Sequence, residues 1–281
     1  MKSFLNILFA AIAFSLCILI AYLTKNEIVL NAVILAFLIQ WVAFIPAYLF
    51  QTEKFYDLTG SLTYLTVIWF VYLSSNQVGE VNFQNLIVTV LISIWAIRLG
   101  SFLFSRIHKD GEDKRFRSIK TSPSQFFMTW TLQGMWVSIC SMCVITGISS
   151  SEGLVLNPLF YLGFILFLIG FSIEVIADHQ KTVFRAIKEN KDKFISTGLW
   201  SKSQHPNYFG EILLWSSIAI MSFSSLSGTQ YLTMISPIFT YVLLVYISGV
   251  RMLDDMGNKK WGHLEEYKQY KQNTPVLYIN L

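Results

Sequence analysis

The stretch SFLNILFAAIAFSLCILIAYL, residues 3–23, determines the fold class. It is long and carries no charged side chain, and a helix needs roughly 20 apolar residues to cross the hydrocarbon core of a bilayer. A single Lys precedes it, and no small-residue cleavage site follows a short apolar core. The stretch therefore predicts a retained transmembrane helix rather than a cleaved signal peptide.

Similar apolar windows recur along the whole chain. Hydrophobic residues make up 54% and charged residues 14%, whereas a soluble domain is about a quarter charged. This composition excludes an ordinary cytosolic enzyme, a disordered chain and a disulfide mini-protein, and the long unbroken windows exclude an outer-membrane barrel. We expect an all-α, polytopic membrane helix bundle that forms one integral membrane domain over residues 1–281. Its predicted spans, about eight, are 3–24, 28–50, 59–75, 84–105, 124–148, 154–177, 207–225 and 231–250.

The distribution of Lys and Arg orients this predicted bundle. Basic residues gather in 106–120, 181–202 and 251–281, while the loops near 76–83, 149–153 and 226–230 contain none. By the positive-inside rule, eight spans place both termini and the basic segments in the cytoplasm. The expected location is a bacterial inner membrane or the endoplasmic reticulum. The net charge of +4 then reflects topology and predicts no nucleic-acid partner; the oligomeric state stays open.

Ionisable residues within the predicted spans lie near their cytoplasmic ends. Arg98 closes the fourth span, Glu174 and Asp178 close the sixth, and Glu211 opens the seventh. Charge inside a span is costly and usually marks a site. Because the outer half of the bundle is nearly free of charge, the pattern argues against a channel or transporter, which needs a polar path through the midplane. It predicts a polar cavity on the cytoplasmic side, open to cytosol and lipid.

Two segments of the C-terminal half, about 154–281, concentrate these polar groups. In EVIADHQKTVFR (174–185), helical spacing places Glu174, Asp178, Lys181 and Arg185 on one face; ordinary intrahelical ion pairs are the alternative. In GLWSKSQHPNYFGE (198–211), Gly198 breaks the chain and proline opens a helix whose free amides form an anion site. The alternative there is an interfacial aromatic belt with a capping Asn. The second segment contributes His205, Asn207, Tyr208 and Glu211.

Two cytoplasmic segments of the N-terminal half also carry chemistry. In EKFYDLTGSLTY (53–64), Asp57 is either an N-cap for the third span or, with Tyr64, half of a proton-donating pair in a partly desolvated pocket. In SRIHKDGEDKRFRSIK (105–120), Arg115 and Arg117 could clamp a phosphate, since guanidinium binds phosphate through two points; a solvated topology loop is the alternative. The three cysteines lie within apolar spans, so no metal site is expected.

Several of these motifs, in the same order along the chain, resemble those of the steroid 5-alpha-reductase-like integral membrane protein family. The resemblance is to the branch of this family that is defined by an uncharacterised domain. That branch is related to the isoprenylcysteine methyltransferases. GLWSKSQHPNYFGE is similar to the family's C-terminal signature, G-L-W-x-Y-S-R-H-P-N-Y-F-G-E. Segments 53–65, 95–116 and 177–185 look like three earlier motifs, and SGVRMLDD (248–255) with YKQYKQNTP (267–275) resembles the usual ending, with Asp254 where a Glu is common.

The resemblance implies an NADPH-dependent reductase of a carbon–carbon double bond in a lipophilic, steroid- or lipid-like enone. It implies that Glu174 and Asp178 hold the ribose or the nicotinamide amide, and that Arg185 meets the phosphates. Asn207 and Glu211 would line the dinucleotide. The C-terminal half would thus carry the cofactor site, and the catalytic acid would come from Asp57 and Tyr64. The remaining predicted cofactor contacts are Arg98, Arg115, Lys181, His205 and Tyr208.

This chain departs from the signature at two positions. Gln204 replaces the usual Arg and Lys202 the usual Tyr, so one charge-assisted contact to an anion is lost and the choice between NADPH and NADH stays open. Two other functions compete with the reductase. An S-adenosylmethionine-dependent membrane methyltransferase of the isoprenylcysteine type has a similar R-H-P-x-Y-x-G element. A non-catalytic lipid-binding membrane protein is the third, with Gln204 as a sign of a decayed pocket.

Overall fold

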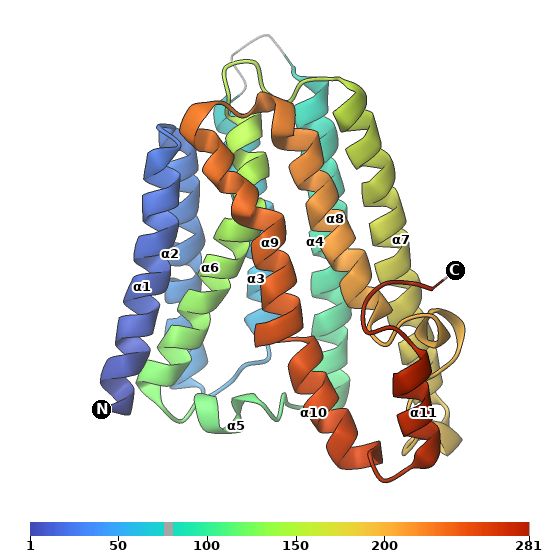
Figure 1. The fold of residues 1–281 in the computed structure, drawn as a ribbon. Helices are drawn as coiled ribbons and strands as arrows, with labels where there is room; N and C mark the ends of the chain where they lie inside the picture. Colours follow the sequence, from blue (N-terminus) through green and yellow to red (C-terminus); the bar gives the residue numbers. More distant parts are fainter. Residues whose placement is uncertain (76–80, 281) are drawn as a thin grey trace. The chain divides into compact units, whose positions relative to one another are not determined.

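The predicted all-α class is confirmed by a computed structural model that describes residues 1–75 and 81–280 (Figure 1). Every regular element within these two ranges is a helix, and neither range contains a β-strand. Most of the loop expected near 76–83, which contains no Lys or Arg, lies outside the described residues.

Seven apolar segments of the described chain are long and apolar enough to cross a membrane. Six of them are α1 (Lys2–Leu23), α2 (Glu27–Leu49), α3 (Tyr56–Ser75), α4 (Phe83–Asp110), α6 (Pro123–Ile148) and α7 (Pro158–Ala186). The seventh segment, Gly228–Trp261, is a succession of short helices instead of one regular helix.

The span predicted at 207–225 corresponds to α8 (Pro206–Ser222), which is not one of these seven segments. This helix has 17 residues and so lies at the short end of the membrane-spanning range.

Short helices connect or interrupt the long ones. Gly228–Trp261 contains a 3-10 helix (Gly228–Met234), α9 (Ile235–Val242), a π-helical turn (Leu243–Ile247) and α10 (Val250–Trp261). The span predicted at 231–250 covers the middle of this segment, and hydropathy does not predict its breaks. The remaining elements are α5 (Phe116–Ile119), α11 (Glu265–Asn273) and the 3-10 turns Lys188–Asn190, Gly198–Ser201 and Phe223–Ser225.

The ends of the long helices follow local chemistry. The side chain of Asn26 accepts hydrogen bonds from the backbone N–H groups of Ile28 (2.9 Å) and Val29 (3.3 Å) and so caps α2. Gly111, with φ of 82°, terminates α4, in a conformation that only glycine adopts without strain. Pro206 opens α8, as the sequence predicts, since its missing N–H is not needed in a first turn.

The chain divides into two compact units. The first unit consists of Met1–Asn157 and Ser222–Ser236, and the second of Pro158–Met221 and Pro237–Leu281. The expectation of a single membrane domain stays a prediction, as does the cytoplasmic location of the termini. Most of the predicted cofactor residues belong to the second unit, which begins close to the predicted boundary at about 154.

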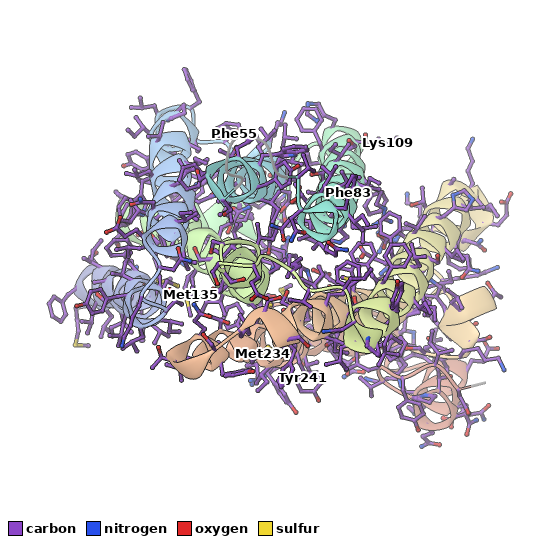
Figure 2. All side chains as sticks on the ribbon, turned by 90° about the horizontal axis from the view of Figure 1, so that it is seen from above. Phe55, Phe83, Lys109, Met135, Met234 and Tyr241 are labelled. Carbon is purple, nitrogen blue, oxygen red and sulfur yellow. The ribbon has the colours of Figure 1, made fainter. Side chains whose placement is uncertain are left out.

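The helix α6 forms the core of the first unit. Its residues 137–148 are all buried, and it packs against α1, α2 and α3, while α3 packs along α4. Figure 2 views these helices end-on, with α6 (labelled at Met135) between its neighbours. By contrast, α1 exposes large apolar side chains such as Phe4, Phe9 and Leu19. A broad exposed apolar face of this kind is typical of contact with lipid.

In the second unit, the last two helices pack on the segment between α7 and α8. The ring of Phe194 lies edge-on to Trp261 and Tyr267, with ring centroids 6.1 and 5.1 Å apart. The chain after α11 then returns to the start of α8, where the backbone N–H of Gln204 donates to the carbonyl of Pro275 at 2.8 Å. This return brings the C-terminal residues beside the predicted cofactor motif.

Candidate active site

A small cavity of about 20 Å³ lies between α3, α4 and α6 in the first unit. That volume accommodates roughly one water-sized group. Its lining residues recur at spacings of three and four along each helix, so one stripe of each helix faces it. They are Asp57, Gly60, Ser61, Tyr64, Trp95, Leu99, Leu103, Gln133, Trp136 and Val137.

The structure brings both predicted catalytic residues to this cavity. Asp57 lies within the first turn of α3, which begins at Tyr56, so it occupies a helical position and not the alternative role of N-cap. Tyr64 lies two turns further along α3; it is buried, and its ring packs edge-on against Trp95 with centroids 5.1 Å apart. Seven residues of helix rise by roughly 10 Å. The carboxyl and the phenol therefore line the cavity at different depths.

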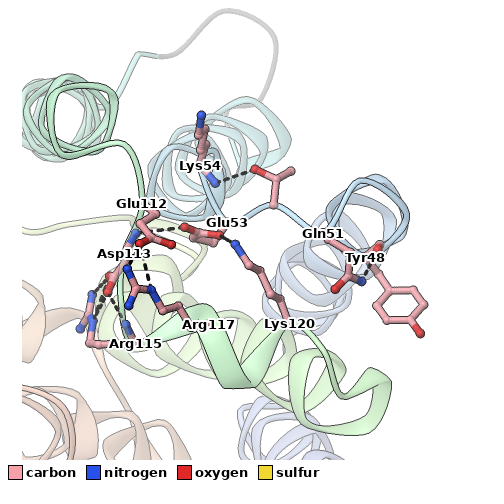
Figure 3. Close-up of polar contacts among 10 residues, drawn as sticks. Tyr48, Gln51, Glu53, Lys54, Glu112, Asp113, Arg115, Arg117 and Lys120 are labelled. Carbon is pink, nitrogen blue, oxygen red and sulfur yellow. Dashed lines mark hydrogen bonds and ion pairs between the residues drawn. The ribbon is translucent and has the colours of Figure 1, made fainter.

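Asp57 faces charged groups at the end of α4 and in the loop that follows it. The guanidinium groups of Arg106 and Arg115 and the carboxylate of Asp113 are close enough to act on its charge. The loop itself is tied to the α2–α3 turn by Glu53, whose side chain is buried. One oxygen of Glu53 accepts a hydrogen bond from the backbone N–H of Asp113 at 3.0 Å, and the other from Lys120 Nζ at 2.7 Å (Figure 3).

The two arginines proposed as a phosphate clamp are engaged inside this loop. Arg115 Nη2 pairs with Asp113 Oδ2 at 2.5 Å, and Arg117 pairs with Glu112. Partial burial alone would raise the pKa of Asp113, but the hydrogen bonds and charge of Arg115 hold that pKa below its usual value. The hydrogen bond from Arg117 likewise lowers the pKa of Glu112. Phosphate binding by these guanidinium groups stays a prediction, and it would compete with these carboxylates.

In the second unit, two glycines bring α7 and α8 into backbone contact. A Cβ atom on Gly210 would lie 2.6 Å from the carbonyl oxygen of Gly170 and 2.7 Å from the backbone nitrogen of Glu174. Small residues at a helix crossing permit such close approach. The crossing is next to Glu174 on α7 and Glu211 on α8, so it fixes the position of both predicted acids.

Three predicted carboxylates are buried around this crossing. The residues Glu174, Asp178 and Glu211 are 2%, 6% and 7% exposed. The amide of Asn207 donates a hydrogen bond to Asp178 Oδ1 at 3.2 Å, as expected if the two motifs face each other. Four of the residues that the sequence assigns to the cofactor therefore share one buried polar region.

His205 and Tyr208 extend this region toward α10 and α11. The two rings stack with centroids 5.7 Å apart. The ring nitrogen His205 Nε2 is 3.6 Å from Asp254 Oδ1, and Lys271 Nζ is 3.0 Å from the other oxygen of Asp254. The separation of 3.6 Å exceeds a hydrogen-bond distance, and both ring nitrogens, Nδ1 and Nε2, are buried without a hydrogen-bond partner among the described residues. His205 thus retains unsatisfied polar atoms.

The substituted residue of the signature, Gln204, binds the C-terminal segment. Its amide nitrogen donates to the carbonyl oxygens of Lys271 at 3.1 Å and Thr274 at 2.5 Å. The neighbouring Ser203 hydroxyl donates to the carbonyl of Leu277 at 2.8 Å. An amide is sufficient for these bonds, so Gln204 serves the fold here; the effect of losing the usual Arg on the cofactor site stays a prediction.

The remaining predicted cofactor residues are divided between the two units. Lys181 and Arg185 lie on α7 of the second unit, and Arg98 and Arg115 belong to the first. Lys181 Nζ is 4.4 Å from the ring centre of Trp200, a cation–π contact, and Arg185 occupies the last turn of α7. Arg98 stacks on Phe102 at 5.2 Å and, like Arg115, belongs to the first unit. A common cofactor contact for Arg98 and the second-unit residues stays a prediction.

The sequence analysis singled out only Asp57 and Tyr64 among the residues that line the cavity. Gln133 and Trp136 are two of those that it missed. A signal was available for Gln133, because an amide inside an apolar span is costly and marks a polar interaction. Trp136 carried no comparable signal, since tryptophan is common in any membrane helix. Their importance emerges only when α6 is placed against α3.

Comparison with known proteins identifies the family. Residues 43–274 match the family described as "Protein of unknown function (DUF1295)", and the chain belongs to it. The mouse and rat proteins named 3-oxo-5-alpha-steroid 4-dehydrogenase 1 are each 32% identical over 127 residues, which is 45% of this chain and 44% of theirs. The predicted resemblance to a steroid 5-alpha-reductase-like family is thereby confirmed.

A methyltransferase also appears among the relatives. The Probable O-methyltransferase ustE of Ustilaginoidea virens is 29% identical over 114 residues, 35% of this chain and 40% of its own length. The chain thus spans less than half of the curated relatives it matches. No solved structure matches it.

Proposed function

We propose that this protein is a membrane-embedded, NADPH-dependent reductase of a carbon–carbon double bond in a lipophilic enone. The observation that carries the proposal is the shared cavity of Asp57 and Tyr64 in a wall of aromatic and apolar side chains. The buried carboxylates and His205 of the second unit support a polar cofactor. The relatives named as steroid dehydrogenases support the reaction class.

The first unit would hold and activate the substrate. Reduction of an enone adds a hydride to the β-carbon and pushes electron density onto the carbonyl oxygen. The Tyr64 hydroxyl would donate a hydrogen bond to that oxygen and stabilise the enolate. Asp57, beside the cytoplasmic loop and its arginines, would supply the proton that completes the addition at the α-carbon. The apolar wall would keep water from this reaction.

The second unit would hold the cofactor, which supplies the hydride when bound. Buried carboxylates at Glu174, Asp178 and Glu211 suit ribose hydroxyls and the carboxamide, both of which donate hydrogen bonds. The unsatisfied Nδ1 of His205 offers one further polar contact. Lys181 and Arg185, on the same helix as two of the acids, would meet the phosphates. These side chains together match the sugar, amide and phosphate parts of a dinucleotide.

S-adenosylmethionine-dependent methyl transfer is the second candidate, because one relative is named an O-methyltransferase. Carboxylates suit the ribose and the cationic centre of that cofactor equally well. The two candidates differ in their need for cations, since only the dinucleotide carries phosphates. Lys181 and Arg185 therefore favour NADPH.

The test is a comparison of cofactors on the purified chain in detergent. We expect NADPH to raise the melting temperature more than S-adenosylmethionine does, because a ligand that binds only the folded state stabilises it. The double variant Lys181→Met and Arg185→Met should lose the response to NADPH. A larger response to S-adenosylmethionine, unchanged in this variant, would assign the protein to methyl transfer.

A further inference from the structure

The cavity in the first unit contains a hydrogen-bond acceptor without a donor. Gln133 is 2% exposed, and its amide nitrogen donates to the backbone carbonyl of Tyr56 at 3.0 Å. That carbonyl can only accept, so the orientation of the amide is determined. The other end of the amide, Oε1, is buried and has no hydrogen-bond partner within residues 1–75 and 81–280.

The same cavity contains a donor without an acceptor. Trp136 lies one helical turn beyond Gln133 on α6, and both side chains line the cavity. The indole Nε1 of Trp136 is buried and also has no hydrogen-bond partner in the described part of the chain. Residues three apart on a helix are neighbours, so an unpaired acceptor and an unpaired donor flank one small space.

Buried polar groups in native proteins are almost always hydrogen-bonded. Few chemical groups could supply the missing hydrogen bonds to both Gln133 and Trp136. A carbonyl oxygen would accept from Trp136 and leave Gln133 unsatisfied. An N–H group would do the reverse. A hydroxyl both donates and accepts and satisfies the two residues together. The cavity, at about 20 Å³, has room for one such group.

We propose that Gln133 and Trp136 form a hydroxyl-binding site that selects a substrate carrying a hydroxyl close to its reacting carbonyl. This inference rests on the proposed reductase function, because it places the hydroxyl beside the oxygen that Tyr64 would bind. The hydroxyl donates to Gln133 Oε1 and accepts from Trp136 Nε1. The substrate class is thereby narrowed from any lipophilic enone to an α-hydroxy enone.

The selectivity is tested by binding, separately from turnover. The probes are 4-decylcyclohex-2-en-1-one and its 6-hydroxy derivative, which differ by one hydroxyl next to the carbonyl. Each is titrated calorimetrically into the purified full-length chain in detergent, with and without NADPH, and protein-free micelles serve as the blank. We expect the hydroxy probe to bind roughly 10- to 100-fold more tightly, the range for leaving a buried polar group unpaired.

Three variants identify the residues responsible. Gln133→Met and Trp136→Phe should each bring the two affinities to near equality, because the group that the unhydroxylated probe leaves unpaired is then absent. Ser138→Ala is the matched control, because Ser138 is buried on the same helix but does not line the cavity; it should keep the preference. A cooperative thermal unfolding transition in detergent shows that the variants fold.

Equal affinities in the unmodified chain would overturn the inference, since an ordered water would then satisfy the pair. A preference that survives in both Gln133→Met and Trp136→Phe would overturn it too. Reduction is followed separately, by the loss of NADPH absorbance with either probe. A preference in binding without any reduction would refute the proposed function and leave the hydroxyl site intact.

Discussion

The two units of this protein surround their polar groups in opposite ways. The cavity of the first unit has a wall of aromatic and aliphatic side chains, with one carboxylate, Asp57, at the end that faces the basic loop. The second unit buries three carboxylates around one helix crossing. Neutral donors in an apolar wall suit an apolar ligand with few oxygens, whereas buried charge suits a ligand rich in hydroxyl and amide groups.

The helices explain how each arrangement arises. In the second unit, Gly170 and Gly210 let two backbones touch, so the acids beside them have little room and stay in place. In the first unit, Trp95 and Trp136 lie on different helices and hold them apart around the cavity. The chain therefore positions charge by close backbone packing, and it lines the small cavity of the first unit with large aromatic rings.

The largest effect is expected from removing one buried acid of the second unit. Glu211→Ala should weaken NADPH binding by about 100-fold or more, because a charge-assisted hydrogen bond in a buried site is lost. Thermal stabilisation by NADPH, measured over a range of concentrations, gives this value. Ser217→Ala is the matched control; Ser217 is buried on the same helix, and its hydroxyl bonds the carbonyl of Leu214. An unchanged NADPH response in Glu211→Ala would remove this residue from the cofactor site.

The second effect should separate chemistry from cofactor binding. Tyr64→Phe should slow single-turnover oxidation of NADPH by an enone about 100- to 1000-fold, the usual cost of losing one donor to a developing oxyanion. Its thermal response to NADPH should stay normal. Tyr72→Phe, a buried tyrosine further along α3 that does not line the cavity, serves as the control. A similar loss of rate in both variants would point to the packing of α3 instead of to a reacting hydroxyl.

The sequence predicts the helices better than it predicts their partners. Hydropathy windows locate the long helices, because each span must bury its own backbone polar groups in lipid. The start of α8 at Pro206 and the end of α4 at Gly111 follow from local chemistry as well. Hydropathy carries no information on the π-helical turn at Leu243–Ile247, because an apolar segment can cross a membrane with either hydrogen-bond pattern.

Residues that act through distant neighbours are the ones that sequence reasoning missed. Asn207 and Asp178 were predicted to share a site because the family resemblance assigns both motifs to the dinucleotide; helical spacing alone places each residue only on a face of its own helix. The bonds from Gln204 to the C-terminal segment depend on a chain reversal about 70 residues later. The role of Gln133 depends on which face of α6 meets α3. Helix periodicity specifies a face but not the helix that it meets.

A third prediction tests whether close packing positions the acids. Gly210→Ala should lower the free energy of unfolding by about 1–3 kcal/mol, because its methyl group would collide with backbone atoms of α7. The sign is diagnostic, since Gly to Ala inside a helix is otherwise stabilising by roughly 0.5–1 kcal/mol. Thermal unfolding in detergent measures the change. A stabilised Gly210→Ala variant would show that the crossing does not hold the two helices together.

The smallest effect concerns how well the charged loop 111–120 of the first unit keeps its structure as the pH falls. The charges of this loop are partly or fully exposed, whereas the carboxylates of the second unit are buried. The pKa of Asp113 and that of Glu112 are lowered by their arginine partners. A lowered folded-state pKa means that the stabilisation is complete above the unfolded value and is lost as the pH falls through the folded one. The loop should therefore keep its hydrogen-exchange protection down to about pH 4 and lose it only below that value.

The double variant Glu112→Gln and Asp113→Asn should show loop protection that varies little with pH, because its carboxylates no longer titrate. The difference from the unmodified chain at neutral pH should be small, since solvent screens exposed ion pairs. Hydrogen exchange of residues 111–120, corrected for the intrinsic pH dependence of exchange, measures both. Protection that already falls near pH 6 would contradict the assignment of this effect to the two carboxylates.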